Sequence, residues 1–396
     1  HVTSATTYGQ GLALRNACTT VITNCVFNNN GVDGGNNTDH NYYGGAVGAE
    51  NGTLTVVDSV FNNNRLWGGG GNIKPRGGAI GANGSTVTIL RCQFNRNCTQ
   101  VVHSRWGGGG ALGFDSSTVV IDRCNFTTNY ARTGTGDGWH GYTQTGPFGG
   151  TFHFNNTTAS VTDCAVVGGW VSNGSQGGMY YDVGGTLFVS GTTGEVTVKR
   201  TSFLDCGDTG YVNCNKNSHG VICIRGSRLN LQNVLVGASF TGLQLACCGG
   251  TLEALNCTFT GGRGLAVNRS QQAFLLTDGT ASLRNCIFWD NAGGSIHVEG
   301  SATPTVTYTD LQTDIGTEDI QYLSADNHVF SADPLFEDAA ALDYRLGKGS
   351  PCINAGNPAG ITRAETDLDG AKRISGASID LGAYERQQNG LIMVLR

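Results

Sequence analysis

Cysteine is the first residue type in this chain whose number and spacing could do chemistry, since the sequence holds 14 of them. Six stand at the same point of a recurring motif, and such an array could bind a metal or react in redox chemistry: Cys25, Cys92, Cys124, Cys164, Cys257 and Cys286. No Cys-x-x-Cys pair occurs, which disfavours a zinc site. A buried free cysteine behaves as a small apolar residue, so we expect these six to be core thiols.

The remaining cysteines lie off this motif. Cys206 and Cys214 share one segment and are the best candidates for a disulfide. Cys98 stands alone, and the adjacent Cys247 and Cys248 could each pair elsewhere. A disulfide would require the oxidising surroundings of secreted proteins.

Carboxylates also recur, and two of them at a suitable separation would allow glycoside hydrolysis. Asp58, Asp122 and Asp163 fall near the same point of successive repeats. The same zone holds arginines that would neutralise them, namely Arg91, Arg123 and Arg200. A mixed row of acids and bases on the surface is the simpler interpretation. We therefore predict no catalytic residue and no enzyme activity.

Asp367 and Asp369, in the run Asp-Leu-Asp-Gly, form a candidate Ca²⁺ site. Calcium takes about six to eight oxygen ligands, so two carboxylates would need other donors beside them. We predict no other cofactor.

Aromatic and basic residues gather in three neighbouring segments of variable length. They are Arg65, Trp67, His103, Arg105, Trp106, Trp139, His140 and Tyr142. On one side of a rod, such residues would stack on sugar rings or form a protein interface. Alternatively, they pack long loops against the wall behind them. The sequence leaves both interpretations open.

The spacing of two recurring motifs indicates the elements that position these residues. A Gly-Gly motif, as at Gly77, is followed after 17 residues by the Phe position of a Cys-x-Phe-type motif, as at Phe94, in four consecutive repeats. From there to the next Gly-Gly motif the distances are 16, 15 and 23 residues. One arc of each repeat is thus fixed in length and the other tolerates insertion. This is expected of stacked coils whose strands must return above one another.

The pattern predicts an all-β chain folded as a right-handed parallel β-helix. Regular coils with variable loops should occupy residues 1–300, and irregular C-terminal coils, a cap and a strand-like tail should occupy residues 301–396. Alternation directs Val87 and Ile89 inward, and a bend at residues 90–91 should separate two short strands. Cysteines and phenylalanines should then form two inward ladders that rise about 4.8 Å per coil. An Asn three residues after each Phe, as at Asn97, suits a left-handed turn and can bond its copy in the next coil.

Composition narrows the function classes. The net charge is −6 and the pI is near 5.7, with no run of basic residues, which disfavours nucleic acid as a partner. No apolar stretch reaches the length of about 18 residues that a membrane span needs. The cysteines and ten Asn-x-Ser/Thr sequons indicate a secreted or cell-surface protein. The candidate glycosylation sites are Asn51, Asn83, Asn97, Asn125 and Asn268. We interpret the start at His1 as that of a processed form or of the ordered part of a longer precursor.

Two stretches resemble known proteins. The run Gly77-Gly-Ala-Ile alternating with Phe-x-x-Asn resembles the repeat pair of the chlamydial polymorphic outer-membrane proteins and related bacterial β-helix surface proteins. The runs Ser350-Pro-Cys-Ile-Asn-Ala-Gly and Ile379-Asp-Leu-Gly-Ala-Tyr-Glu resemble the end region of "choice-of-anchor" proteins. The resemblance implies a secreted surface β-helix and fixes no activity.

We therefore expect a non-enzymatic, extracellular structural or adhesive protein. Open strand edges at the ends of a β-helix invite association, and residues 390–396 form an apolar, strand-like tail. Head-to-tail assembly into a filament or surface array is the corresponding hypothesis for its partners. The alternative is a carbohydrate-active enzyme (a polysaccharide lyase or glycoside hydrolase) or a glycan-binding module that uses the Trp-rich loops on a polysaccharide. Convergent carboxylates with a metal would indicate the enzyme.

Overall fold

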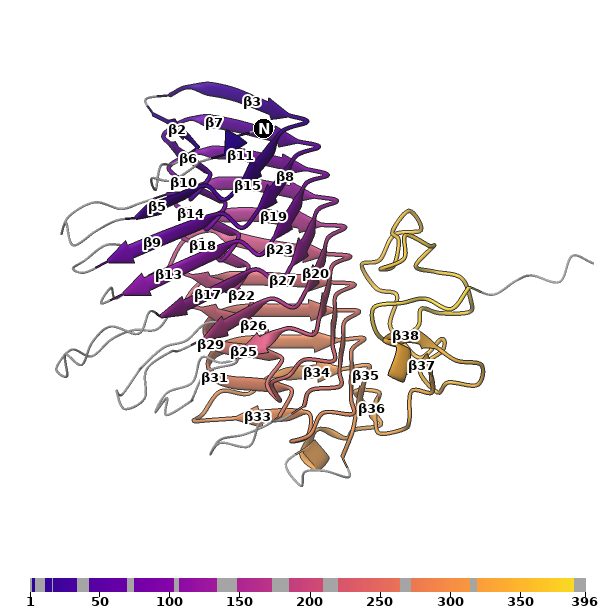
Figure 1. Cartoon of the computed structure of the whole chain (residues 1–396). Coiled ribbons are helices and arrows are strands. Elements are labelled where there is room, and N and C mark those ends of the chain that lie inside the picture. Colours follow the sequence, from indigo (N-terminus) through magenta and orange to yellow (C-terminus); the bar gives the residue numbers. More distant parts are fainter. Residues whose placement is uncertain are drawn as a thin grey trace, which may run out of the picture.

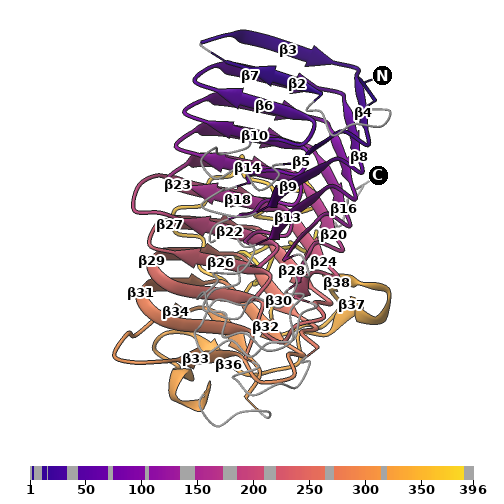
Figure 2. The same ribbon diagram turned by 60° about the vertical axis from the view of Figure 1, so that its left-hand side comes forward.

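The computed structural model describes eleven ranges of the chain, which together form one rod of stacked coils (Figure 1). They are residues 2–3, 11–15, 17–33, 43–69, 75–102, 107–133, 148–172, 185–208, 220–263, 272–313 and 319–387. The chain winds as a right-handed parallel β-helix, as predicted; the strands of its coils form three parallel sheets, and an antiparallel pair of strands follows them. Figure 2 shows the coils stacked from β3 at the N-terminal end to β33 and β36 at the other.

Sheet A holds the short strands of the Cys-x-Phe motif, each hydrogen-bonded to its copy in the next coil. Its 12 strands are β1 Val2–Thr3, β4 Val26–Asn28, β8 Val60–Asn62, β12 Gln93–Asn95, β16 Asn125–Thr127, β20 Ala165–Val167, β24 Ser202–Leu204, β28 Leu235–Gly237, β30 Thr258–Thr260, β32 Ile287–Trp289, β35 Thr309–Leu311 and β36 Val329–Phe330.

Sheet B has two columns of strands, one following the Gly-Gly motif and one preceding the bend. The first column holds β2 Leu12–Leu14, β6 Val47–Glu50, β10 Ile80–Asn83, β14 Leu112–Asp115, β18 Phe152–Asn155, β22 Leu187–Ser190, β26 Ile222–Arg225 and β33 Ile296–Val298. The second holds β3 Thr19–Thr23, β7 Thr53–Val57, β11 Thr86–Leu90, β15 Thr118–Asp122, β19 Thr158–Thr162, β23 Glu195–Lys199, β27 Arg228–Gln232 and β34 Thr305–Thr307. Two long strands, β29 Leu245–Leu255 and β31 Phe274–Arg284, span both columns.

Sheet C is formed by the strands that begin the variable arc. Its six strands are β5 Gly31–Asp33, β9 Arg65–Gly69, β13 Cys98–Val102, β17 Tyr130–Thr133, β21 Trp170–Ser172 and β25 Gly207–Asp208. The variable arcs that follow β5, β9, β13, β17, β21 and β25 all begin from this sheet. Function that depends on loops is therefore concentrated on one side of the rod.

The two predicted inward ladders are confirmed. The rings of Phe27, Phe61, Phe94 and Phe126 stack with centroids 4.8, 4.9 and 4.9 Å apart, which is the rise of one coil. Five of the six ladder cysteines are buried, and Cys25, in the first of these coils, is half-buried. The Cys124 Sγ accepts a hydrogen bond from the Cys92 amide at 3.3 Å. The cysteines therefore fill the core and also satisfy backbone donors at the bend.

The bend between sheets B and A depends on one left-handed residue per coil, as expected at residues 90–91. Arg91 has φ +50° there, and this corner position recurs along the rod as Asn24, Asp58, Arg91, Arg123, Asp163, Arg200, Asn233, Asn256 and Asn285. The turn predicted at the Asn ladder differs by one residue. Its left-handed residues precede the asparagines, as Arg96 does Asn97. Asn97 itself is buried, and its Nδ2 donates to Phe61 O at 2.9 Å and to Asn129 Oδ1 at 3.0 Å.

The coils run through β36, and residues 331–387, the C-terminal segment, then fold back along the outside of sheet A (Figure 1). It contains β37 Phe336–Asp338, the 3₁₀ turn η2 Ala339–Ala341 and β38 Asp343–Leu346, and another 3₁₀ turn, η1 Asp319–Tyr322, precedes it. Leu346, Cys352 and Leu381 pack on Ile287 of β32, and Ala383 N donates to Thr258 Oγ1. The expected cap over the C-terminal end is thus a lateral cover, because sheet A offers apolar outward side chains there. No helix among the described residues is long and apolar enough to cross a membrane.

Candidate contact surface

The outer face of sheet C brings together aromatic, cationic and amide side chains from four successive coils. In β9, β13, β17 and β21 the second residue points into the coil and is buried: Leu66, Thr99, Ala131 and Val171. The residues on either side of it therefore point outward. They form two rows along the rod, Arg65–Cys98–Tyr130–Trp170 and Trp67–Gln100–Arg132–Ser172. We call these outward side chains the sheet C surface.

Two arginines on this surface converge on one neutral amide. Arg65 Nη2 donates to Gln100 Oε1 at 3.0 Å, and Arg132 donates to the same oxygen from Nε at 3.2 Å and from Nη2 at 2.9 Å. Neither guanidinium has a carboxylate partner among the described residues. Two positive charges thus lie close together with only a dipole between them. Such a pair would favour an anionic group placed beside it.

Aromatic rings flank the arginines. The Arg65 guanidinium lies 5.1 Å from the Trp67 ring centroid, and Arg132 lies 5.8 Å from that of Tyr130. Tyr130 in turn stacks on Trp170 at 4.3 Å with an interplanar angle of 4°. The Trp67 Nε1 and Arg65 Nε atoms are buried and donate to no described group. Burial, followed by the Cys98 thiol, raises the pKa of Tyr130 to about 12, so its hydroxyl stays protonated and polar.

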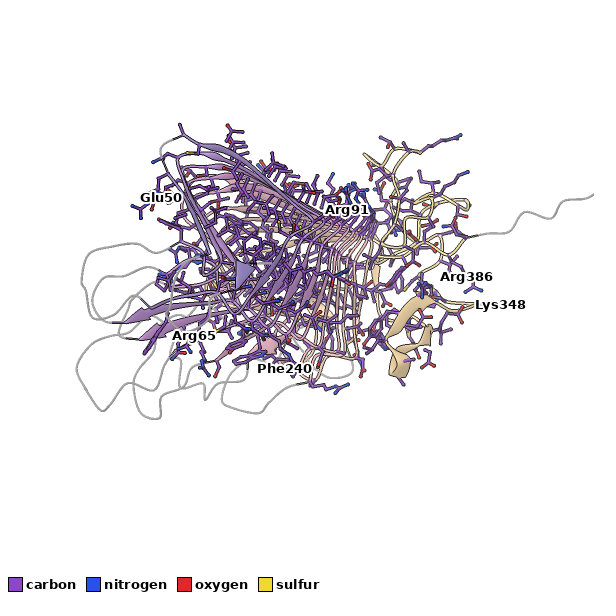
Figure 3. All side chains as sticks on the ribbon, turned by 45° about the horizontal axis from the view of Figure 1, so that its top comes forward. Glu50, Arg65, Arg91, Phe240, Lys348 and Arg386 are labelled. Carbon is purple, nitrogen blue, oxygen red and sulfur yellow. The ribbon has the colours of Figure 1, made fainter. Side chains whose placement is uncertain are left out.

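The opposite side of the rod has a different electrostatic pattern. At the bend between sheets B and A, Arg91 forms a bidentate ion pair with Asp58 of the preceding coil, with N···O distances of 2.7 and 2.8 Å. Arg200 does the same with Asp163, and Arg123 pairs with Asp122. The neutralised surface predicted for these residues is therefore present. Figure 3 shows that Arg65 and Arg91 lie on different sides of the rod.

A buried polar network lies at the roots of the variable segments, and the sequence interpretation missed it. The residue before each Gly-Gly motif pairs with its copy in the next coil, in the order Tyr43, Arg76, Gly108 and Phe148. These residues cover the outer face of the first column of sheet B. The glycines of that column allow the contact, since a Cβ at Gly81 would lie 2.1 Å from Arg76 O. In the sequence, the only sign of this network is that its members Tyr43 and Arg76 stand directly before a Gly-Gly motif.

The network itself joins a cation, a carboxylate and a histidine. Arg76 Nε contacts both carboxylate oxygens of Asp115 at 3.1 Å, and Arg76 Nη1 lies 3.1 Å from His153 Nδ1. Burial and the Arg76 charge hold the pKa of His153 well below 6.5, so its ring is neutral. Arg76 then donates to Nδ1, and the Nε2 proton points to Ser190 Oγ at 3.0 Å. Asp115 also accepts from Tyr43 and Asn155. Its carboxylate is thus engaged in holding the loop roots.

The structure describes only part of the predicted site. Arg65 and Trp67 lie together in β9 on the sheet C surface, and their role in contacting a ligand stays a prediction. The other candidates, His103, Arg105, Trp106, Trp139, His140 and Tyr142, lie outside the described residues. Gln100, Tyr130, Arg132 and Trp170 complete the surface and were not predicted, because they lie on a third sheet that the two recurring motifs do not indicate.

The remaining candidates have mixed outcomes. Cys206 is buried inside the coil, and Cys214 lies outside the described residues, so their pairing stays a prediction. Asn51 and Asn125 are exposed and Asn83 is half-buried, whereas Asn268 lies outside the described residues. Asn97 is fully buried with both amide hydrogens engaged. A glycan there is incompatible with the folded coil, and that candidate was wrong.

The two candidate calcium ligands have other partners. Asp367 Oδ1 accepts from the amides of Asp369 and Ala371, and its Oδ2 accepts from Glu385 N. Asp369 pairs with Arg345 at 2.6 and 3.0 Å. No group of three or more potential metal ligands occurs among the described residues. These two aspartates therefore act as turn and ion-pair residues in the C-terminal segment.

Comparison with known proteins agrees with the fold. The profile of the family described as "right handed beta helix region" matches residues 179–311. No curated protein and no solved structure gives a significant match. The matched family is a β-helix family in general, so the likeness to polymorphic outer-membrane proteins and to anchor regions stays a prediction.

Proposed function

We propose that this β-helix is an extracellular adhesive protein that binds an acidic polysaccharide along its sheet C surface. The observation that carries the proposal is the pair Arg65 and Arg132, which converge on the Gln100 amide without a carboxylate partner among the described residues. A carboxylate or sulfate group of the polymer would supply the missing countercharge. The neighbouring half-buried Trp67 indole would offer the accessible part of its apolar ring to a sugar.

Binding rather than cleavage is favoured by the state of the carboxylates. Glycoside hydrolysis needs two carboxyl groups on either side of one bond. Asp115, the carboxylate buried beside the loop roots, is held by Arg76, Tyr43 and Asn155. Those at the sheet B–A bend are paired with arginines on another side of the rod. A carbohydrate-active enzyme would have to take its acid and base from elsewhere in the chain.

Binding to immobilised acidic and neutral polysaccharides tests the proposal. Alginate and heparin are suitable acidic probes, and dextran is the neutral one. We expect salt-sensitive binding to an acidic polymer, and R65A or R132A should weaken it roughly tenfold, which corresponds to about 1.4 kcal/mol. R91A removes an arginine that is paired with Asp58 and serves as the matched control.

Two results would overturn it. One is the absence of binding to every acidic polymer, and the other is an equal loss in R65A and R91A. Incubating the same polymers with the protein and measuring new reducing ends or unsaturated products tests the enzyme alternative directly. Cleavage of the polysaccharide chains would show that the protein is an enzyme rather than an adhesive protein.

Self-association is a second candidate, favoured by the open ends of the rod. At the N-terminal end, β2 and β3 pair with β6 and β7 on one edge, and no second partner occurs among the described residues. At the other end, β33 and β34 pair only with β31 within the described ranges. Parallel edges at opposite ends can pair with one another, which would give a head-to-tail filament. Light scattering at rising concentration tests this, and a monodisperse monomer throughout would rule it out.

The extracellular location has its own test. If the chain is secreted from a glycosylating host, Asn51 and Asn125 are accessible acceptors, whereas Asn97 is not. Peptide mass mapping before and after glycosidase treatment should show modification at one or both of the exposed sequons. Glycosylation at Asn97 would contradict the register of the Asn ladder.

A further inference from the structure

Two cysteines from neighbouring coils lie side by side on the outside of the first column of sheet B. In the parallel pair β26–β29, Cys223 is opposite Ala246 and Ile224 is opposite Cys247. Ile224 and Cys247 belong to the inner core, so alternation turns Cys223 and Cys248 to the outer face. There Cys223 belongs to an outer apolar cluster with Phe188 and Ala246, and Cys248 packs against it.

The two thiols are in direct contact. A side-chain hydrogen bond joins Cys223 to Cys248. This hydrogen bond, ahead of burial, raises the pKa of the Cys223 thiol. Cys223 is fully buried, whereas Cys248 is partly exposed. A reagent from solution can therefore reach the Cys248 thiol, and the buried Cys223 thiol is in contact with it.

The backbone around Cys248 can adjust. The register between β29 and β31 shifts on both sides of Cys248. Gly249 and Gly250 follow it with φ of +107° and +92°, and Gly226 closes the same corner one coil earlier with φ +83°. Glycine permits several backbone conformations at such a corner. The small movement that separates hydrogen-bonded sulfurs from bonded ones is thus available.

We propose that Cys223 and Cys248 form a disulfide when the folded protein meets a small-molecule disulfide such as oxidised glutathione. The Cys248 Sγ loses its proton and attacks one sulfur of the reagent, which releases one equivalent of thiol and leaves a mixed disulfide. The Cys223 Sγ then loses its proton and attacks the Cys248 Sγ, expelling the second thiol. The two protein thiols are oxidised and the reagent disulfide is reduced to two thiols. The product is a covalent link between neighbouring coils.

The buried thiols inside the described coils do not offer this reaction. Cys92 and Cys124 also stack in adjacent coils, but both lie inside the core, and the Cys124 Sγ accepts the Cys92 amide. Cys247 directs its sulfur inward, toward Asp278 O at 3.7 Å. The pair Cys223–Cys248 differs because one of its members has access to solvent.

The experiment treats the folded full-length chain with oxidised glutathione, blocks remaining thiols with an alkylating agent after denaturation, and maps the peptides by mass spectrometry. The expected product is a peptide pair linked through Cys223 and Cys248, accompanied by loss of two hydrogens from the intact protein. In C223S, Cys248 should instead retain glutathione, because no second thiol resolves the mixed disulfide. C247S is the matched control and should still form the link.

Several outcomes would overturn the proposal. They are alkylation of both cysteines in the treated wild-type chain, a stable mixed disulfide at Cys248 while Cys223 is present, or linkage of Cys248 to another cysteine. If C223S fails to fold, C248S provides the same test from the other side. In that variant, Cys223 should remain an unreacted thiol because it is fully buried.

Discussion

Sheet A has two halves that share one backbone and differ in what covers them. In the bare half, β4 to β20, outward residues such as Gln93, Asn125 and Thr127 are exposed. In the covered half, β28 to β35, the outward positions hold Leu235, Ile287 and Asp310, which are buried under the C-terminal segment. Both halves contain stacked inward phenylalanines with the same rise per coil. The difference therefore lies entirely on the outer face.

The left-handed corner residues at the bend between sheets B and A also differ between the two halves. All of them have φ near +50°, from Asn24 at +53° to Asn285 at +56°. In the bare half, most of them are charged and form exposed ion pairs between coils. In the covered half, the corners before β28, β30 and β32 are buried asparagines, namely Asn233, Asn256 and Asn285, and the corner before β35 is the half-buried Tyr308. An amide can adopt the left-handed corner and also bond a docked backbone without burying a charge. Buried asparagines at three successive corners thus mark where the rod is covered.

The largest expected effect follows from removing the buried cation of the cover. Arg373 is fully buried, donates to Asp380 O and Gly382 O, and offsets the nearby charges of Glu385, Asp380 and Asp367. R373A should destabilise the docked segment by about 3–5 kcal/mol, because it leaves buried carboxylates without a countercharge. Hydrogen exchange should rise in residues 331–387 and on the outer face of β28 to β35, while β4 to β20 stay protected. Equal loss of protection in both halves would contradict the comparison.

A smaller effect is expected from the covered corner itself. Asn285 Nδ2 donates to Asn256 Oδ1 and Asn357 O, and its Oδ1 accepts from Asn357 N. N285A should cost about 1–3 kcal/mol, because buried partners lose their hydrogen bonds. Asn24 is the matched control, since it has the same residue type and nearly the same φ at an exposed corner. Thermal unfolding of N285A and N24A compares the two directly, and equal shifts would mean that the docked backbone contributes nothing at Asn285.

Acidification should affect the two parts of the rod in opposite directions. Burial raises the pKa of Asp310 and of Glu385 to about 7, so the folded cover binds protons that the unfolded chain, with values of 3.8 and 4.5, does not. Their contribution to stability is full below these lower values and is lost as the pH rises through about 7. His153 has the reverse sign, because its folded pKa lies well below 6.5. Its neutral buried form loses stability as the pH falls below 6.5.

Hydrogen exchange measured between about pH 7.5 and pH 5, and corrected for the intrinsic exchange rate, detects both effects. Each unit of difference between the folded and unfolded pKa changes the free energy of unfolding by at most about 1.4 kcal/mol. The cover should become more protected on acidification, and β14 to β22 less protected. D310N is the control, since it keeps the shape and removes one titrating group, and it should reduce the gain in the cover alone. A change of the same sign in both parts would overturn this assignment.

The fold could be predicted from the sequence because the repeat of the two motifs reflects the repeat of the coils. The fixed spacing from Gly77 to Phe94 implies stacked strands, and alternation around Val87 and Ile89 identifies the inward face. The docking of the C-terminal segment was not accessible. Leu235 and Ile287 look like further core residues in sequence, and only their outward orientation shows that something covers them.

The candidate site was accessible in part for a related reason. Arg65 and Trp67 stand out by residue type in the sequence, and both lie on the sheet C surface. Gln100 and Arg132 belong to ordinary short stretches, and their meeting depends on the register of β9, β13 and β17, which no local pattern reveals. Residues that act through long-range register are the ones that sequence reasoning misses.

The smallest expected effect is at the bare corner, and it is the sharpest test of the comparison. Arg91 is exposed at φ +50° and pairs with exposed Asp58, which holds the pKa of that carboxyl below its usual 3.8. R91N removes this pair but puts at the left-handed corner a residue that tolerates it better. We expect a melting temperature indistinguishable from wild type in both low and high salt, because water already solvates both partners. The reciprocal N285R keeps the corner and forces a charge beneath the cover, so it should release residues 331–387 to proteolysis. If R91N destabilised the rod as N285R does, the corner residues would be matched to the backbone rather than to what covers them.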